Sequence, residues 1–190
     1  MKGPSEPIIS FALMIEELTS LLCRCSAARE QVDGVFRIME RTLAGVDQLD
    51  LSRLTPGMSS YARHLIHRDP QNRFVVLGLV WKPGQGTPVH DHPSWGVVGV
   101  LKGQMKFVNY AFNEDPEGKR LVVSEQILGT QGAVTTVFPP ECDIHRMGNP
   151  APAGNSITLH CYGQELTEFH IYNLDTGARR VGTVSYDSEP

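Results

Sequence analysis

The chain has 190 residues, a length typical of one domain, and 41% of its residues are hydrophobic while 20% are charged. Its formal net charge of −4 gives no electrostatic reason to expect nucleic acid or an anionic membrane as a partner. No apolar run approaches the roughly 18 residues that a transmembrane helix needs, and residues 1–7 lack the basic-then-apolar pattern of a signal peptide. We therefore expect a cytoplasmic protein with reduced cysteines, present as a monomer or weak homo-oligomer.

The first part of the chain, from Ile8 to Leu54, is predicted to be helical. Apolar residues recur at helical spacing from Phe11 to Leu22, and Ser10 before them is a suitable N-cap. A second stretch with the same periodicity runs from Val32 to Leu43. Gly45 is expected to end it, because glycine commonly follows the last turn of a helix.

After Pro56-Gly57 the sequence consists of short apolar runs separated by turns rich in glycine and proline. The predicted strands are residues 73–81, 96–101, 105–112, 121–128, 133–138, 157–161, 169–172 and 181–186. Short strands at this spacing favour an all-β sandwich or barrel, and few segments resemble the crossover helices of a parallel sheet. We expect one mainly β domain, with a jelly-roll barrel over residues 56–190 and a helical cap over residues 1–55.

Two histidines, His90 and His92, follow a Gly/Pro-rich turn. Residues i and i+2 of a strand point to the same face, so a strand here would direct both imidazoles into the barrel. Imidazole is a suitable ligand for iron, zinc, copper and nickel. The alternative interpretation of two histidines separated by one residue is a pair on a solvated strand.

The residues around this pair resemble the first motif of the cupin superfamily. The matching positions are Gly84, His90, His92, Gly96 and Gly103. Most cupins carry a glutamate ligand where Gly96 stands, so the resemblance excludes a carboxylate ligand from that position.

The segment from Pro139 to Asn149 resembles the second cupin motif and contributes His145. The resemblance thus implies three neutral metal ligands, His90, His92 and His145. Such a site keeps the full +2 charge of the metal and suits an anionic thiolate together with dioxygen. A zinc site with three histidines and a water is the competing chemistry.

Two more segments resemble a narrower family, the cysteine dioxygenase-like thiol dioxygenases, and the likeness extends roughly from Tyr61 to Tyr162. Tyr61-Ala-Arg63-His-Leu65 looks like the family's Y-x-R-x-L segment, whose arginine binds the substrate carboxylate. The resemblance implies that Arg63 and Tyr61 bind substrate. A guanidinium pairs with a carboxylate through two parallel hydrogen bonds; a surface salt bridge is the alternative role for Arg63.

The segment Ser156-Ile-Thr-Leu-His-Cys-Tyr looks like the family's S-x-H-x-Y triad, with Thr158 in the serine position and His160 and Tyr162 matching directly. Strand alternation places these three side chains on one face and Cys161 on the other. The resemblance implies a catalytic relay that orients the tyrosine hydroxyl. A buried strand whose polar groups merely pair with one another is the alternative.

The chain also departs from the animal cysteine dioxygenases. Those enzymes carry a cysteine at the position of Gly96 that cross-links to the tyrosine matching Tyr162, so the cross-link cannot form here, as in bacterial arginine-type members. They continue past that tyrosine with Ser-Pro-Pro, whereas this chain has Gly163-Gln-Glu165. We therefore expect the pocket wall to differ.

Taken together, the resemblance implies an Fe(II)-dependent dioxygenase that uses O2 to convert a small carboxylate-bearing thiol to its sulfinic acid. L-Cysteine is the first-choice substrate because Arg63 matches the arginine-type members, and 3-mercaptopropionate and mercaptosuccinate are alternatives. A non-catalytic ligand-binding cupin, and a zinc or nickel cupin with isomerase or hydrolase activity, are alternatives from other classes.

Several polar and aromatic residues have no motif support. His64, His67 and His170 are expected to be structural or exposed. Trp81 and Trp95 are expected to pack, with the pocket mouth as an alternative place for Trp95. Arg179-Arg180 is expected to form a solvated turn, with a second substrate carboxylate as its alternative partner.

Overall fold

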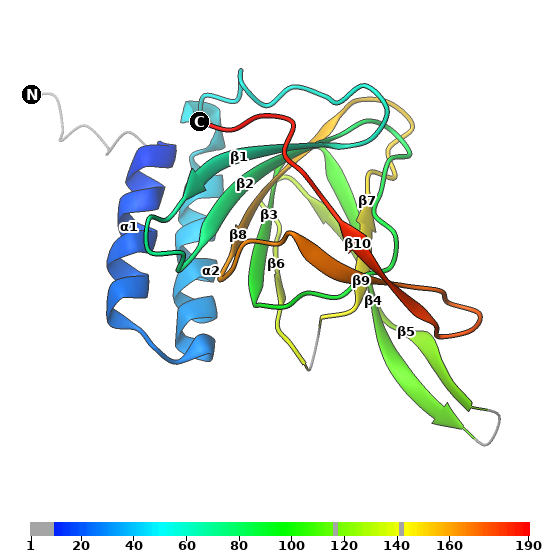
Figure 1. The fold of residues 1–190 in the computed structure, drawn as a ribbon. Helices are drawn as coiled ribbons and strands as arrows, with labels where there is room; N and C mark the ends of the chain where they lie inside the picture. Colours follow the sequence, from blue (N-terminus) through cyan, green and yellow to red (C-terminus); the bar gives the residue numbers. More distant parts are fainter. Residues whose placement is uncertain (1–9, 116–117, 141–142) are drawn as a thin grey trace, which may run out of the picture.

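The computed structural model describes residues 10–115, 118–140 and 143–190, and it shows two helices packed against a barrel of strands (Figure 1). The helices are α1 (Phe11–Arg24) and α2 (Ala28–Ala44), followed by the 3-10 helix η1 (Val46–Gln48). The strands are β1 (Ala62–Arg68), β2 (Val75–Trp81), β3 (Gly96–Lys102), β4 (Gln104–Asp115), β5 (Gly118–Thr130), β6 (Val134–Val137), β7 (His145–Gly148), β8 (Ser156–Tyr162), β9 (Glu168–Tyr172) and β10 (Arg179–Thr183). The prediction of a mainly β, cupin-type jelly roll with N-terminal helices is confirmed.

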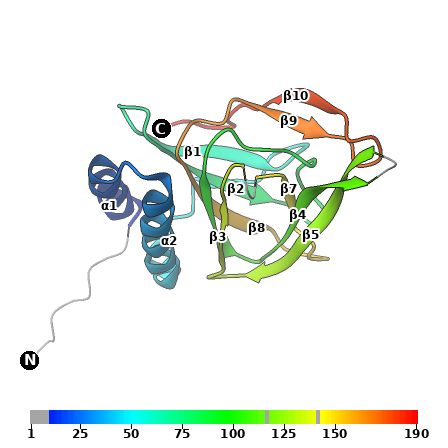
Figure 2. The same ribbon diagram turned by 90° about the horizontal axis from the view of Figure 1, so that it is seen from below.

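The barrel has two walls. One is a five-stranded sheet in the order β1-β2-β8-β3-β6, and the other combines the three-stranded sheet β5-β4-β7 with the pair β10-β9. Within these sheets the paired strands run antiparallel. Both helices lie against the outer face of the five-stranded sheet, and β4 and β5 lie on the opposite side of the barrel (Figure 2).

The five-stranded sheet is buried on both faces, which explains the continuous apolar runs of its central strands. All seven residues of β8 are buried, and so are all seven of β2. In β8, Leu159 and Cys161 join the core beneath the helices, whereas Tyr162 joins the core inside the barrel. Each fully buried leucine or valine contributes about 1.5–3 kcal/mol, so this double-sided burial holds β8 rigidly between the two cores.

The helix boundaries agree with the sequence at two caps. Ser10 Oγ accepts a hydrogen bond from the Leu13 N–H, as an N-cap should, and Gly45 follows the last residue of α2. The prediction of helix as far as Leu54 is wrong. The chain turns after η1, where the Asp50 carboxylate accepts the Ser52 N–H, a local bond that competes with helix formation.

Two strands, β1 and β7, were not expected from the sequence. Both carry histidine and arginine side chains, and their burial depends on partners elsewhere in the fold rather than on an apolar pattern. Ile8, Cys142 and residues 116 and 117, which fall between the predicted strands at 105–112 and 121–128, lie outside the described residues. No helix in the described part of the chain combines the length and apolar character that crossing a bilayer requires.

Candidate active site

Three histidines gather inside the barrel. His90, His92 and His145 each offer a ring nitrogen, and these atoms lie within 4.8 Å of one another. The Nε2 atoms of His92 and His145 are 3.1 Å apart, and all three side chains are buried. In the chain as described, this is the only group of three or more histidine, cysteine or carboxylate side chains close enough to hold a metal ion.

The backbone places these histidines differently from the expectation of a continuous strand. His90 forms isolated bridges and His92 lies in a loop, so the strand prediction for this pair is wrong. His90 and His145 instead exchange backbone hydrogen bonds, each N–H donating to the other's carbonyl at 2.9 Å. His90 also faces Ile171 of β9. The ligand geometry thus comes from pairing of distant segments.

Asp91, between the two histidines, fastens this loop to β9. Its carboxylate accepts hydrogen bonds from the His170 backbone N–H at 2.7 Å, from His170 Nδ1 at 2.8 Å and from the Tyr172 hydroxyl at 2.9 Å. Burial raises the pKa of Asp91, but these hydrogen bonds outweigh burial and the pKa is lowered. His170 therefore has the structural role that the sequence left open for it.

Burial also sets the protonation of the three histidines. It lowers the pKa of His90 to about 4, and it lowers the pKa values of His92 and His145 well below their ordinary range. The His90 Nδ1–H donates to the Pro88 carbonyl at 3.0 Å, which leaves Nε2 with its lone pair. Neutral imidazoles are the form that binds metal, so this donor set fits a divalent transition metal.

A second group of polar side chains forms a hydrogen-bonded chain along β8. Thr158 Oγ1 lies 2.7 Å from His160 Nε2, and His160 Nδ1 lies 2.8 Å from the Tyr162 hydroxyl. The three residues share one strand face, as the alternation predicted. The chain has a fourth member that sequence reasoning assigned only to packing, because Trp81 Nε1–H donates to Thr158 Oγ1 at 2.9 Å.

Trp81 fixes the direction of this chain, since an indole N–H can only donate. Thr158 accepts from Trp81 and, having no other acceptor in the described structure, donates to His160 Nε2. His160 then carries its hydrogen on Nδ1 and donates to the Tyr162 oxygen. Burial raises the pKa of Tyr162, so the phenol stays protonated and its own hydrogen points onward.

Gly96 makes room for the Tyr162 ring. The two residues are direct cross-strand partners in β3 and β8. A Cβ atom at position 96 would lie 2.6 Å from both Cδ1 and Cε1 of the ring, closer than carbon atoms can approach. The ring therefore rests on the bare backbone of Gly96. Cys161 points away into the core beneath the helices, as predicted.

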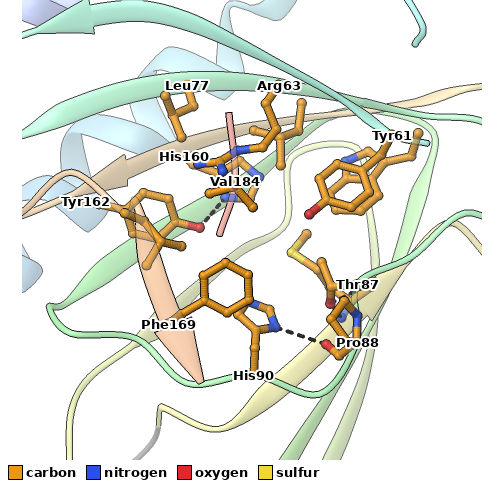
Figure 3. A pocket seen from close by; sticks show the side chains of 14 residues that line it. Tyr61, Arg63, Leu77, Thr87, Pro88, His90, His160, Tyr162, Phe169 and Val184 are labelled. Carbon is orange, nitrogen blue, oxygen red and sulfur yellow. Dashed lines mark hydrogen bonds between the residues drawn. The ribbon is translucent and has the colours of Figure 1, made fainter. Parts of the chain in front are cut away.

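The cavity beside the histidines is the candidate substrate pocket (Figure 3). Arg63 and Tyr61 approach it from one side, and His90 lies on the opposite side. Arg63 is only 6% exposed, so the alternative of a surface salt bridge is wrong. Within the described residues, no carboxylate pairs with its guanidinium, which lies over the ring of Tyr186 instead. Tyr61 stacks on Trp81, with ring centroids 4.3 Å apart.

Other residues singled out in the sequence lie elsewhere. Trp95 packs beneath the helices, as expected, where its Nε1–H donates to Gln31 Oε1, and the alternative place at the pocket mouth is wrong. His64 is buried between the Thr55 carbonyl and the Ser188 hydroxyl, a structural role. Arg179 and Arg180 are exposed on β10 and do not line the pocket.

Several pocket residues were missed by sequence reasoning. Leu166, Phe169 and Val184 complete the lining, and they come from segments in which no motif was visible. The ring of Phe169 stands edge-on to His90 at 5.3 Å. Phe169 lies in β9, and Leu166 and Val184 lie in connecting segments. An apolar residue in either setting carries no signal that distinguishes a pocket wall from ordinary core, so only the fold reveals them.

Comparison with known proteins identifies a family. The model of the family described as cysteine dioxygenase type I matches residues 9–174 of the 190. Cysteine dioxygenase type 1 of Homo sapiens is 23% identical over 130 residues, and the protein of the same name from Rattus norvegicus is 22% identical over the same length. Each match covers 68% of this chain and 64% of the relative, so this chain spans just under two thirds of those proteins.

Solved structures with a similar arrangement are more distant in sequence. A conserved protein with a double-stranded β-helix domain from Klebsiella pneumoniae has a TM-score of 0.48 and 16% identity, covering 73% of this chain and 88% of its own. A protein from Thermus thermophilus has a TM-score of 0.44 and 20% identity, covering 60% of this chain and 94% of its own.

Proposed function

This chain belongs to the cysteine dioxygenase type I family, and we propose that it is an iron-dependent thiol dioxygenase. Its reaction would add both atoms of O2 to the sulfur of a small carboxylate-bearing thiol, L-cysteine in the first place, and release the sulfinic acid. The observation that carries this proposal is the buried Arg63 guanidinium, which has no carboxylate partner in the described structure and shares a small cavity with His90, one of the three clustered histidines.

Arg63 would bind and orient the substrate. A buried guanidinium strongly favours an anionic partner, and a carboxylate meets its planar donors with two parallel hydrogen bonds. With the carboxylate held there, the thiol end of a short substrate extends toward His90, His92 and His145. Fixing both ends in this way is a positioning contribution, because it removes the freedom that the reacting groups have in solution.

His90, His92 and His145 would hold Fe(II), which supplies the redox chemistry that allows O2 to react with a thiolate. Three histidines and no carboxylate leave the charge of the ion uncompensated, which suits an anionic sulfur donor. The metal-binding capacity rests on the convergence of buried neutral imidazoles, whereas the choice of iron rests on the family.

Tyr162 would donate a hydrogen bond into the reaction chamber. At the end of the hydrogen-bonded chain of Trp81, Thr158 and His160, the His160 Nδ1–H donates to the Tyr162 oxygen. The phenolic hydrogen is therefore free to point at the substrate or at an oxygen atom. Because burial keeps the phenol protonated, this donor is present throughout the neutral range. Thr158 and His160 act through Tyr162 and serve to position it.

The cavity limits the substrate. Of the lysines and arginines in the described chain, Arg63 alone lines it, which provides for one carboxylate rather than two. This favours L-cysteine or 3-mercaptopropionate over mercaptosuccinate. We expect the enzyme to work in the cytoplasm, where a free thiol substrate stays reduced.

Oxygen uptake by iron-loaded protein tests the proposal. We expect consumption with L-cysteine and formation of a product heavier by two oxygen atoms, less with 3-mercaptopropionate, and least with mercaptosuccinate. Arg63→Met should raise the KM for these substrates at least tenfold, and Arg63→Lys, which keeps the charge but not the paired donors, should restore only part of the loss. No consumption with any of the three thiols would refute a thiol dioxygenase.

The alternatives from other classes give different results. A non-catalytic cupin would bind a thiol without consuming oxygen, and a zinc or nickel cupin would carry that metal when purified without added metal. Metal analysis of the untreated protein separates these cases from an iron enzyme. In a dioxygenase, restoring Fe(II) restores activity, whereas Zn(II) does not.

A further inference from the structure

The C-terminal segment, residues 184–189, lies along β1 next to the pocket. Figure 1 shows it as the red end of the chain beside β1. The Asp187 N–H donates to the Arg63 carbonyl at 2.7 Å, and the Leu65 N–H donates to the Ser188 carbonyl at 2.9 Å. The segment thus extends the barrel wall by a short parallel pairing. Residues 175–190 lie outside the part that the family model matches.

Two side chains of the segment act on Arg63. The Asp187 Oδ2 atom accepts a hydrogen bond from the Arg63 backbone N–H at 2.8 Å. The Tyr186 ring lies under the guanidinium, with its centroid 5.3 Å from Cζ. One contact fixes the backbone of Arg63 and the other supports its charged end, which is an attractive geometry for a cation on an aromatic face.

Tyr186 is itself fixed by an ion pair. Its hydroxyl donates to Glu165 Oε1 at 2.8 Å, and Arg68 donates to both oxygens of the same carboxylate, at 2.8 Å and 3.0 Å. Glu165 belongs to the Gly163-Gln-Glu165 sequence in which the chain departs from the animal enzymes. Arg68 therefore keeps the Glu165 carboxylate engaged, and the Arg63 guanidinium stays available for another anion.

We propose that Tyr186 is a positioning residue for substrate binding, which holds Arg63 in the orientation that receives the substrate carboxylate. The Glu165–Arg68 pair sets the place of the Tyr186 ring, and Val184 of the same segment forms part of the pocket wall. This role deepens the proposed function and rests on it. It makes the C-terminal segment part of the substrate site rather than a peripheral extension.

Calorimetric binding of thiols to the iron-loaded protein without oxygen tests this role. Tyr186→Leu removes both the ring and the hydroxyl, and should raise the Kd for L-cysteine about tenfold. Tyr186→Phe keeps the ring over Arg63 and should raise it about two- to threefold. Cysteamine has the thiol and amine but no carboxylate, so its Kd should not change in either variant.

A double-mutant cycle with Arg63→Met separates positioning from a general structural effect. Once Arg63 is gone, Tyr186→Leu should have no further effect on the Kd for L-cysteine. Circular dichroism establishes that each variant is folded. An equal loss of cysteamine binding, or an undiminished effect in the Arg63→Met background, would overturn the role of Tyr186.

The outcome also separates the two proposals. One outcome is that Tyr186 and Arg63 are coupled in binding carboxylate thiols, while the wild type consumes no oxygen. This would refute the dioxygenase and support the positioning role. If the wild type consumes oxygen but the Tyr186→Leu variant binds L-cysteine as tightly as the wild type, the dioxygenase is supported and the positioning role of Tyr186 is refuted. A wild type that binds none of the three carboxylate thiols would overturn both.

Discussion

Replacing Thr158 by valine removes one hydroxyl from the buried chain of hydrogen bonds that ends at Tyr162. Valine has nearly the same shape, so the change leaves the packing intact and isolates the hydrogen bonds. Two buried groups lose their partner, the Trp81 Nε1–H and His160 Nε2. An unpaired buried donor or acceptor costs about 1–3 kcal/mol, so with two such groups we expect the free energy of unfolding to fall by about 2–6 kcal/mol.

Urea unfolding followed by circular dichroism measures this loss, and Thr158→Ser is the matched control. Serine keeps the hydroxyl and removes one methyl group, so it should lower the free energy of unfolding by only about 1 kcal/mol. Oxygen uptake should follow the same order, because only the serine variant still orients Tyr162. Free energies of unfolding that differ by less than about 0.5 kcal/mol between the two variants would contradict the hydrogen-bonded chain.

Three further outcomes follow from the site. His145→Ala should lower the metal bound per chain to near zero, measured by elemental analysis, and retention of a full equivalent would exclude this ligand set. Gly96→Ala should displace the Tyr162 ring and lower kcat about tenfold or more with little change in metal content; unchanged kcat would contradict the close contact. Burial lowers the pKa of His90 to about 4 and that of His160 to about 3, from 6.5. As the pH falls below about 6.5, the unfolded chain therefore takes up protons that the folded metal-free protein does not. Its free energy of unfolding should decrease by about 2 kcal/mol per such histidine between about pH 7 and pH 5, measured by urea denaturation at each pH, and a flat profile would contradict this burial.

The strands with an apolar pattern were predictable, and those whose burial depends on the site were not. The continuous apolar sequence of β2 is typical of a buried strand, and both faces of β2 do pack against hydrophobic core. By contrast, β1 carries Arg63, His64 and His67, which sequence patterns assign to a solvated segment. Arg63 and His64 meet Asp187 and Ser188 of the C-terminal segment, each 124 positions away along the chain. The division into a cap over residues 1–55 and a barrel over residues 56–190 stays a prediction.

The site shows the same limit. The alternation on β8 pointed to Thr158, His160 and Tyr162, because short-range spacing in a strand reports which residues share a face. The histidines were found through their resemblance to the two cupin motifs, although the strand expected for His90 and His92 is absent. The link from Trp81 to Thr158 spans 77 positions, and Asp91 meets His170 across 79. Contacts of this length are set by the pairing of the strands, and a single sequence carries no direct signal of them.

The two-sided burial of β8 constrains how this chain can change over evolution. Successive residues serve different interiors, with Leu159 and Cys161 beneath the helices and His160 and Tyr162 facing the chamber. A deletion of one residue inside the strand would exchange these two sets, which would turn a thiol toward the metal centre and an imidazole into the helix interface. Insertions and deletions are therefore tolerable in the loop at positions 150–155 but not within β8. The strand can diverge only by substitution, one face at a time.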